Sequence, residues 1–231
     1  MAKEIAGSGA ETEGYNVIII PSKTVGDTAI RLSKRLSRSF DTYFTLDGKT
    51  RYPHITIYQS RFPRRNFEAL KESIREISAT HEPFHVRMSE IVYCSDYACR
   101  GFVSWLCKYR QDSTLVAIQR DVLRRLKPLR EGLMPSGVAS LDKRRLTANQ
   151  RSSIKRYGSL VPNLAFPFHI TIGRIRDVRI GTRKANETNE ASFLAENIAI
   201  GRLGEHGVVN EILEDFELGS ASATRKTNHK P

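Results

Sequence analysis

Long hydrophobic runs are missing from this sequence of 231 residues. The longest apolar stretch runs from Val17 to Pro21, far below the roughly 20 residues that a membrane-spanning helix needs. Residues 1–14 are polar and acidic and contain no apolar segment of the signal-peptide type. We therefore expect no membrane partner and an intracellular, cytoplasmic location, with the nucleus as an alternative.

Cysteine is scarce as well, with three residues at Cys94, Cys99 and Cys107. Their number is odd, and their spacing matches no familiar zinc pattern. A metal site would also need a fourth ligand that we cannot nominate. Buried or half-buried free thiols are the expected arrangement, with no metal and no cofactor.

Acidic residues are too few to balance the basic ones, and the formal net charge is +12. Such an excess favours polyanionic partners through phosphate neutralisation and counterion release. The share of hydrophobic residues, 39%, is ordinary for a soluble globular protein. The length fits one large domain or two small lobes that share an interface.

The positive charge is concentrated between Arg124 and Arg156, where ten basic residues face two acidic ones. This basic segment either contacts RNA phosphates or is a solvated helix face and loop. The residues proposed for RNA contact are Arg144, Arg145, Arg151, Lys155 and Arg156.

Strand-like and helix-like patterns alternate along the chain between two ends, 1–14 and 220–231, that we expect to be disordered. The expected strands are Tyr15–Ile20, His54–Tyr58, Phe84–Cys94, Phe102–Tyr109, His169–Ile175, Phe193–Ile200 and Val208–Leu218. The expected helices are Val25–Phe40, Phe67–Ile77 and Leu115–Leu129. Residues of about 131–163 form a long basic insertion, with a short helix from Asp142 to Tyr157 as an option.

One pattern occurs twice. The segments Tyr52–Ile57 and Phe166–Ile172 each contain an aromatic residue and a proline ahead of the same tetrapeptide, His-Ile-Thr-Ile. A single His-x-Thr on a strand is commonplace and usually indicates an ordinary histidine. Two identical copies in corresponding strands indicate two related halves that share a site. The remaining histidines, in solvated or hairpin positions, are His81, His85, His206 and His229.

Side chains alternate on a strand, so each copy presents its imidazole and its hydroxyl on one face. Two imidazoles poised near neutral pKa suit a phosphodiester, because one accepts a proton from the attacking oxygen while the other donates one to the leaving oxygen. The hydroxyls can hold the non-bridging oxygens. No metal is required for this chemistry.

The paired motifs, beginning at His54 and His169, resemble those of the two-histidine (2H) phosphoesterase superfamily, and in particular its 2′-5′ RNA ligase and cyclic phosphodiesterase branch. The resemblance implies an α+β fold over residues 15–219, with two antiparallel sheets flanked by helices in a bilobal, pseudo-twofold arrangement around a cleft. It implies catalytic roles for His54 and His169 and phosphate-binding roles for Thr56 and Thr171.

Two further residues are candidates for substrate contact. Arg174 matches a basic residue often found after the second motif, although strand parity turns it away from His169 unless Gly173 allows a bulge. Tyr58 shares the face of His54 and Thr56 by parity, and either stacks on a base or packs in the core.

The expected function is a metal-independent hydrolase, a monomeric phosphodiesterase acting on a 2′,3′-cyclic phosphate or a 2′-5′ linkage of RNA or a nucleotide. RNA ligation is the corresponding reverse reaction. The alternatives are an RNA-binding module of the same fold that performs no turnover and a phosphoesterase for a non-RNA small molecule.

Overall fold

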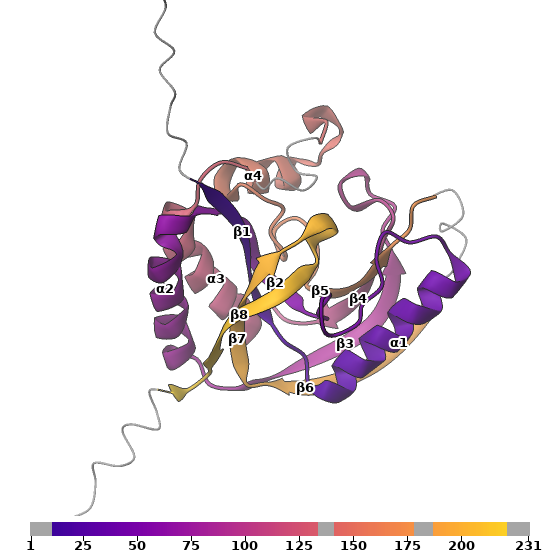
Figure 1. Ribbon diagram of the computed structural model, residues 1–231, viewed down its shortest axis with the longest axis horizontal. Helices are drawn as coiled ribbons and strands as arrows, with labels where there is room; N and C mark the ends of the chain where they lie inside the picture. The colour runs from indigo at the N-terminus through magenta and orange to yellow at the C-terminus, as the bar shows by residue number, and fades with distance from the viewer. Residues whose placement is uncertain (1–10, 134–140, 178–186, 221–231) are drawn as a thin grey trace, which may run out of the picture.

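The computed structural model describes residues 11–133, 141–177 and 187–220, and Figure 1 shows a strongly curled sheet with helices packed against it. The strands are β1 (Thr12–Ile19), β2 (Ile55–Pro63), β3 (Phe84–Tyr93), β4 (Phe102–Lys108), β5 (His169–Arg174), β6 (Glu187–Ala195), β7 (Asn197–Leu203) and β8 (Val209–Glu217). The α-helices are α1 (Lys23–Ser39), α2 (Phe67–Thr80), α3 (Thr114–Leu126) and α4 (Ala148–Tyr157). Short 3₁₀ turns are η1 (Arg64–Asn66), η2 (Tyr97–Cys99), η3 (Lys127–Leu129), η4 (Lys143–Arg145) and η5 (Glu205–Gly207).

The eight strands form one sheet in the order β6-β3-β4-β5-β2-β1-β7-β8, and neighbouring strands pair antiparallel. This confirms the α+β class. The two expected halves, β6-β3-β4-β5 and β2-β1-β7-β8, are joined into one curled sheet by the pairing of β2 with β5. At this junction Ile55 lies opposite Ile170.

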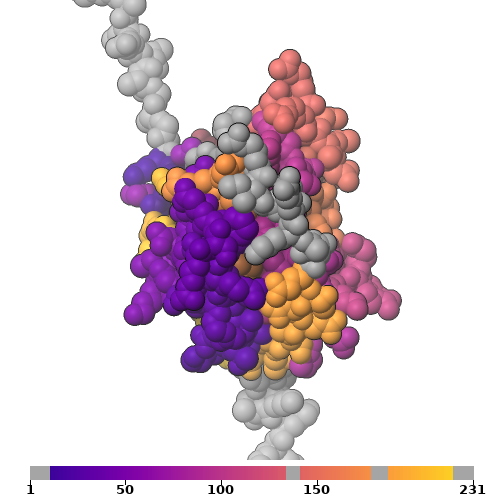
Figure 2. All heavy atoms as spheres, turned by 90° about the vertical axis from the view of Figure 1, so that its right-hand side faces the viewer, coloured from indigo at the N-terminus to yellow at the C-terminus, as the bar shows by residue number. Residues whose placement is uncertain are grey.

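Helix α1 covers the half of the sheet that contains β5. Its buried residues, Val25, Ala29, Ser33 and Leu36, recur three or four positions apart and so lie along one side of the helix. Figure 2 shows α1, in indigo to violet, beside the orange strand β6. Arg35 of α1 and Glu187 of β6 form an ion pair of 2.7 Å across this contact.

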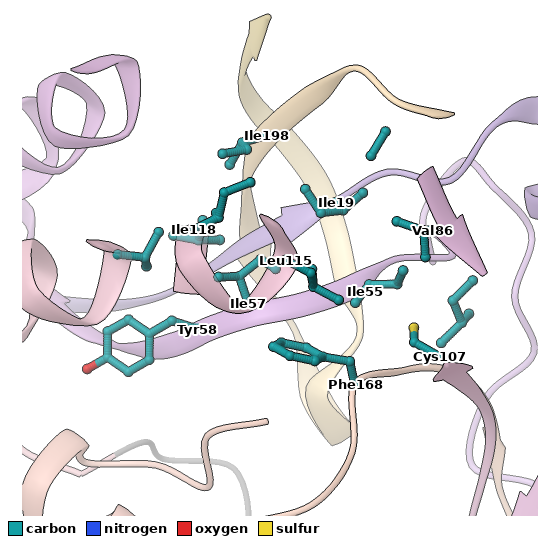
Figure 3. Close-up of a cluster of buried hydrophobic side chains, with 14 of the residues drawn as sticks. Ile19, Ile55, Ile57, Tyr58, Val86, Cys107, Leu115, Ile118, Phe168 and Ile198 are labelled. Carbon is teal, nitrogen blue, oxygen red and sulfur yellow. The ribbon is translucent and has the colours of Figure 1, made fainter. Parts of the chain in front are cut away.

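Helices α2 and α3 cover the other half, against β2, β7 and β8. Figure 3 shows part of the core there, with Ile55 and Ile57 of β2 beside Leu115 and Ile118 of α3. All four side chains are buried. The isoleucines between and after His and Thr of the first motif therefore point into the core, as strand alternation requires.

Two expected boundaries are wrong. Strand β1 begins at Thr12, within the expected disordered end, while residues 1–10 and 221–231 lie outside the described residues. The expected strand Phe193–Ile200 is two strands that meet at Glu196, because the chain crosses here between halves: β6 pairs with β3, and β7 pairs with β1 and β8.

The C-terminal part of the basic insertion is a folded unit. Helix α4 starts with a capping box in which the Thr147 side chain accepts from the Gln150 backbone and the Gln150 side chain accepts from the Thr147 backbone. It ends at Gly158, whose φ of 75° is the left-handed conformation that favours glycine. The short helix offered for Asp142 to Tyr157 is therefore confirmed over Ala148–Tyr157, whereas residues 134–140 lie outside the described residues.

Candidate active site

The two repeated motifs meet where β2 pairs with β5. Continuing the antiparallel register from the Ile55–Ile170 pair sets His54 opposite Thr171 and Thr56 opposite His169. We call these four side chains the motif quartet. They share the face of the sheet opposite to Ile55 and Ile170, and the two imidazoles lie on one diagonal and the two hydroxyls on the other. The quartet thus has local twofold symmetry about the isoleucine pair.

Each imidazole is held by the backbone carbonyl two residues before it. Nδ1 of His54 lies 2.8 Å from the carbonyl oxygen of Tyr52, and Nδ1 of His169 lies 2.9 Å from that of Pro167. A carbonyl only accepts, so each Nδ1 carries the proton and donates it. Both Nε2 atoms of the neutral rings are therefore left as proton acceptors.

Burial shifts the ionisation of both rings. His54 is 7% exposed, and burial is the main cause that lowers its pKa to about 4. The hydrogen bond to the Tyr52 carbonyl raises this pKa, and the positive charge that His169 can carry lowers it further. Burial also lowers the pKa of His169, which is half-buried. The near-neutral pKa expected from the sequence is therefore wrong for His54 in the free protein, because burial withdraws this ring from water, and the pKa of His169 is shifted in the same direction.

Asn16 of β1 belongs to the site although the sequence motifs did not point to it. Its Nδ2 donates to Thr56 Oγ1 at 3.0 Å and lies 3.4 Å from His54 Nε2. The sequence already contained a sign of it, because Asn16 is a polar residue inside the otherwise apolar run Tyr15–Ile20. A buried amide in such a run needs a specific reason.

A bulge in β5 turns Arg174 to the face of the quartet. Strand β4 pairs Ser104 with Thr171 and Val103 with Gly173, so Ile172 is the extra residue. Ile172 and Gly173 are both buried, whereas Arg174 is half-buried, like His169 and Thr171. The bulge that the sequence allowed is therefore present.

Arg174 is held by aromatic rings and by a histidine. Its guanidinium lies 4.8 Å from the ring centre of Phe102 and 5.2 Å from that of Tyr43. Its Nη1 lies 3.2 Å from Nδ1 of His206, in the β7–β8 hairpin. Burial and the charge of Arg174 lower the pKa of His206, so this ring accepts the hydrogen bond. Within the described ranges no carboxylate forms an ion pair with Arg174.

Tyr58 packs in the core instead of facing a substrate. It is 1% exposed, and its hydroxyl donates to the carbonyl of Tyr157 at 2.8 Å. The strand-parity argument fails because β2 and β1 change register at Ile57, so that Ile57 and Tyr58 are both buried. The stacking option is therefore excluded, and the packing option holds.

The five residues proposed for RNA contact differ in their surroundings, although all are exposed. Arg145 lies over the ring of Tyr97 at 3.9 Å, and Arg151 donates to the carbonyl of Leu146, so both fasten the segment. Arg144 pairs with Asp142 at 3.2 Å. Arg156 lies 5.5 Å from the ring of its neighbour Tyr157, and Lys155 is the fifth residue.

The segment that contains α4 packs close to His169. Leu146, Ile154 and Leu160 form a small buried cluster, against which Tyr97 and Phe166 pack. The ring of Phe166 in turn lies 5.3 Å from the imidazole of His169. Packing of the basic insertion therefore reaches the second motif.

Two cysteines expected to be free are joined. Cys94 and Cys99 form a disulfide around the β3–β4 connection, with Cα atoms 5.7 Å apart, while Cys107 is free and buried. The free-thiol expectation is thus wrong for Cys94 and Cys99, because the hairpin brings their Cα atoms within bonding reach. Burial raises the pKa of the Cys107 thiol.

A pocket of about 300 Å³ lies between α1 and the sheet, lined among others by Leu32, Leu36, Ile91 and Ile172. None of the quartet lines it, so this pocket is separate from the candidate site. Across the described ranges, no three His, Cys, Asp or Glu side chains gather as metal ligands would. In the same part of the chain, no helix is long and apolar enough to span a bilayer.

Solved structures share this fold. TT0787 of Thermus thermophilus has a TM-score of 0.60 and 14% identity, over 89% of this chain and 98% of that one. Ligand-free E. coli LigT has a TM-score of 0.52 and 12% identity, over 90% and 98%. A protein described as a phosphoesterase has a TM-score of 0.51 and 12% identity, over 90% and 99%. The similarity shows the fold, which is the one that the paired motifs led us to expect.

No curated protein sequence matches the chain significantly. The family model described as "Protein of unknown function (DUF1045)" matches residues 62–204, which is more than half of the chain. The matched region contains His169 and Thr171 and begins just after His54 and Thr56. The chain therefore belongs to the DUF1045 family.

Proposed function

We propose that this protein is a metal-independent phosphodiesterase that uses His54 and His169 as an acid/base pair. The observation that carries this proposal is the twofold arrangement of the quartet, with both Nδ1 atoms engaged by carbonyls. Two histidines held in this way present two Nε2 atoms on one face, which is what in-line displacement at phosphorus needs.

The reaction is a displacement at phosphorus. One imidazole removes a proton from the attacking water or hydroxyl, whose oxygen forms a bond to phosphorus. The bond from phosphorus to the leaving oxygen breaks, and that oxygen receives a proton from the other imidazole. Thr56, Thr171 and Arg174 stabilise the non-bridging oxygens, where negative charge redistributes in the transition state. Proton exchange with solvent then restores both rings.

We propose RNA or a nucleotide as the substrate, with a 2′,3′-cyclic phosphate or a 2′-5′ linkage as the bond that is cut. The net charge of +12 supports a polyanion. E. coli LigT has also been solved in complex with NADP⁺, which supports a nucleotide, at a TM-score of 0.50 to this chain. The exposed residues Arg144, Lys155 and Arg156 are proposed to contact phosphates beyond the scissile bond.

The test is turnover by the purified protein in EDTA on three substrates: 2′,3′-cyclic mononucleotides, 2′-5′ dinucleotides, and short RNAs that end in a cyclic phosphate. We expect turnover of at least one, lost in His54→Ala and retained in a control, His85→Ala, whose side chain is exposed on β3. RNA binding without turnover would favour an idle binding module. Turnover only of phosphodiesters unrelated to nucleotides would favour a small-molecule enzyme.

A further inference from the structure

Asn16 lies at the centre of the first motif. Strand β1 pairs with β2, and the Asn16 side chain is fully buried on the face of the quartet, beside Ile18. Its single amide nitrogen approaches both chemical groups of the motif, Thr56 Oγ1 at 3.0 Å and His54 Nε2 at 3.4 Å. No other described side chain contacts both residues through hydrogen bonds.

The carbonyl of Tyr52 determines which way these contacts run. It accepts a hydrogen bond from Nδ1–H of His54, so Nε2 of the neutral ring is an acceptor and pairs only with a donor. The amide NH₂ of Asn16 is that donor. Protonation of Nε2 would place its N–H group against an N–H group of the Asn16 amide, so the contact favours the neutral imidazole. The same NH₂ occupies an acceptor position of Thr56, which leaves the Thr56 hydroxyl proton available to a phosphate oxygen.

The oxygen of this amide has no hydrogen-bond partner among the described residues. Asn16 Oδ1 is buried, and no described residue donates a hydrogen bond to it. A buried carbonyl without a hydrogen bond lowers the stability of the fold. An apolar residue would fit this strand without that cost, so stability does not account for an amide here. The contacts of Asn16 with His54 and Thr56 account for the amide at this position.

We propose that Asn16 is a positioning residue that keeps the Nε2 lone pair of His54 unprotonated, and thereby makes His54 the base and His169 the acid. The assignment of base and acid roles rests on the proposed function, whereas the protonation state of His54 does not. His169 has no matching donor, because no described residue forms a hydrogen bond with its Nε2. The two motifs therefore differ in this contact.

The assigned step is balanced. The attacking O–H replaces the long Asn16 contact at His54 Nε2 and gives its proton there. The new bond to phosphorus forms, the bond from phosphorus to the leaving oxygen breaks, and the leaving oxygen takes the Nε2 proton of the His169 imidazolium. His54 ends protonated and His169 neutral, and solvent exchange reverses both.

Few charges face His54. His169 is the charged group that acts on its pKa, and the other described neighbours, Asn16, Thr56 and the Tyr52 carbonyl, do not titrate. The lowered pKa of His54 agrees with a ring that rests neutral. A carboxylate at position 16 would accept from protonated Nε2 and reverse this preference.

The experiment is an NMR titration of ¹⁵N-labelled protein. In the wild type, His54 should stay in the Nδ1–H form down to about pH 5, and the Asn16 NH₂ signals should shift as His54 titrates. Asn16→Asp should raise the pKa of His54 from about 4 toward its ordinary value of 6.5. The control Gln119→Leu removes another buried amide, which donates to the carbonyls of Ile57 and Pro162, and should leave the pKa of His54 unchanged.

Two results in the wild type would overturn the proposal even if no variant folds. One is a proton on Nε2 of His54 in the resting protein, and the other is Asn16 NH₂ signals that do not shift as His54 titrates. On a substrate that the protein turns over, Asn16→Asp should narrow the pH range of kcat/KM and lower kcat/KM at pH 5 by roughly 10-fold or more. A higher kcat/KM at the optimum would reverse the roles of the two histidines. Absence of turnover in every assay would refute the proposed function alone, because the titration needs no substrate.

Discussion

Burial sets the charge of the two imidazoles at the scale of the residue. Both rings have pKa values below the ordinary 6.5, so both are neutral in the free protein at neutral pH. General acid catalysis needs one of them protonated. The negative charge of a bound phosphodiester raises the pKa of a nearby imidazole and supplies this condition.

A bell-shaped pH dependence of kcat/KM follows. Activity should rise as His54 loses its proton, near a pKa of about 4, and fall as His169 loses its proton, below the ordinary value of 6.5. The optimum of kcat/KM should therefore lie on the acid side of neutrality, and kcat should peak at higher pH because bound phosphate raises both pKa values. A rate that rises monotonically with pH would indicate metal-activated water instead.

The site residues that belong to the repeated motif could be predicted from the sequence. The quartet could be placed because strand alternation is regular and the motif occurs twice. Asn16 occurs once and sits in an apolar run, and only the pairing of β1 with β2 brings it to His54. Tyr58 was ambiguous because a change of register alters parity, and periodicity alone does not show such changes.

At the scale of elements, the β7–β8 hairpin supports the first motif. The backbone N–H of Tyr52 donates to the carbonyl of Val209 at 3.0 Å, and the carbonyl of Tyr52 holds His54. A Cβ on Gly201 would lie 2.5 Å from Cγ1 of Val209. Because valine is stiff and this one is fully buried, the hairpin itself must move.

Gly201→Ala should therefore lower both stability and activity. Overpacking of this kind costs about 1–3 kcal/mol, and thermal unfolding together with kcat would measure the effect. Gly26→Ala in α1 is the matched control, since its Cβ would meet nothing closer than 3.9 Å. Alanine should stabilise that helix by about 0.5–1 kcal/mol. Equal melting temperatures for the two variants would contradict this account of the hairpin.

The basic segment offers a second prediction at this scale. A triple substitution to Gln should raise KM for an oligonucleotide; it changes Arg144, Lys155 and Arg156. Arg145 and Arg151 are kept because their contacts stabilise the segment. The log-log salt slope should flatten by roughly 0.7 for each phosphate that is no longer neutralised. Turnover of a 2′,3′-cyclic mononucleotide should barely change. An equal loss of activity on the oligonucleotide and on the mononucleotide would mean that the segment supports the site through Phe166 and His169.

Most elements were predictable from hydrophobic periodicity, and the exceptions have identifiable causes. The break at Glu196 was missed because apolar residues lie on both sides of it, and the pairing partners are what separate β6 from β7. Packing of the basic insertion was missed because its small core, with Leu146, Ile154 and Leu160, is shared with distant Tyr97.

At the scale of the whole molecule, two halves contribute one histidine each and meet at the Ile55–Ile170 pair. The repeat predicted the halves, and the family resemblance of the paired motifs implied the α+β class. It could not predict that a single sheet joins them, because strand order depends on contacts between segments far apart in the chain. The charge of the chain indicates a polyanionic partner and says nothing about which bond is cut.

The most direct test of the central claim is turnover by His54→Ala, His169→Ala and the double variant, each shown to be folded by circular dichroism and assayed in EDTA. Each single change should reduce kcat by about 10²- to 10⁴-fold. The double variant should be little worse than the worse single one, because the two rings act as a unit. Near-normal rates in either folded single variant would contradict the two-histidine mechanism.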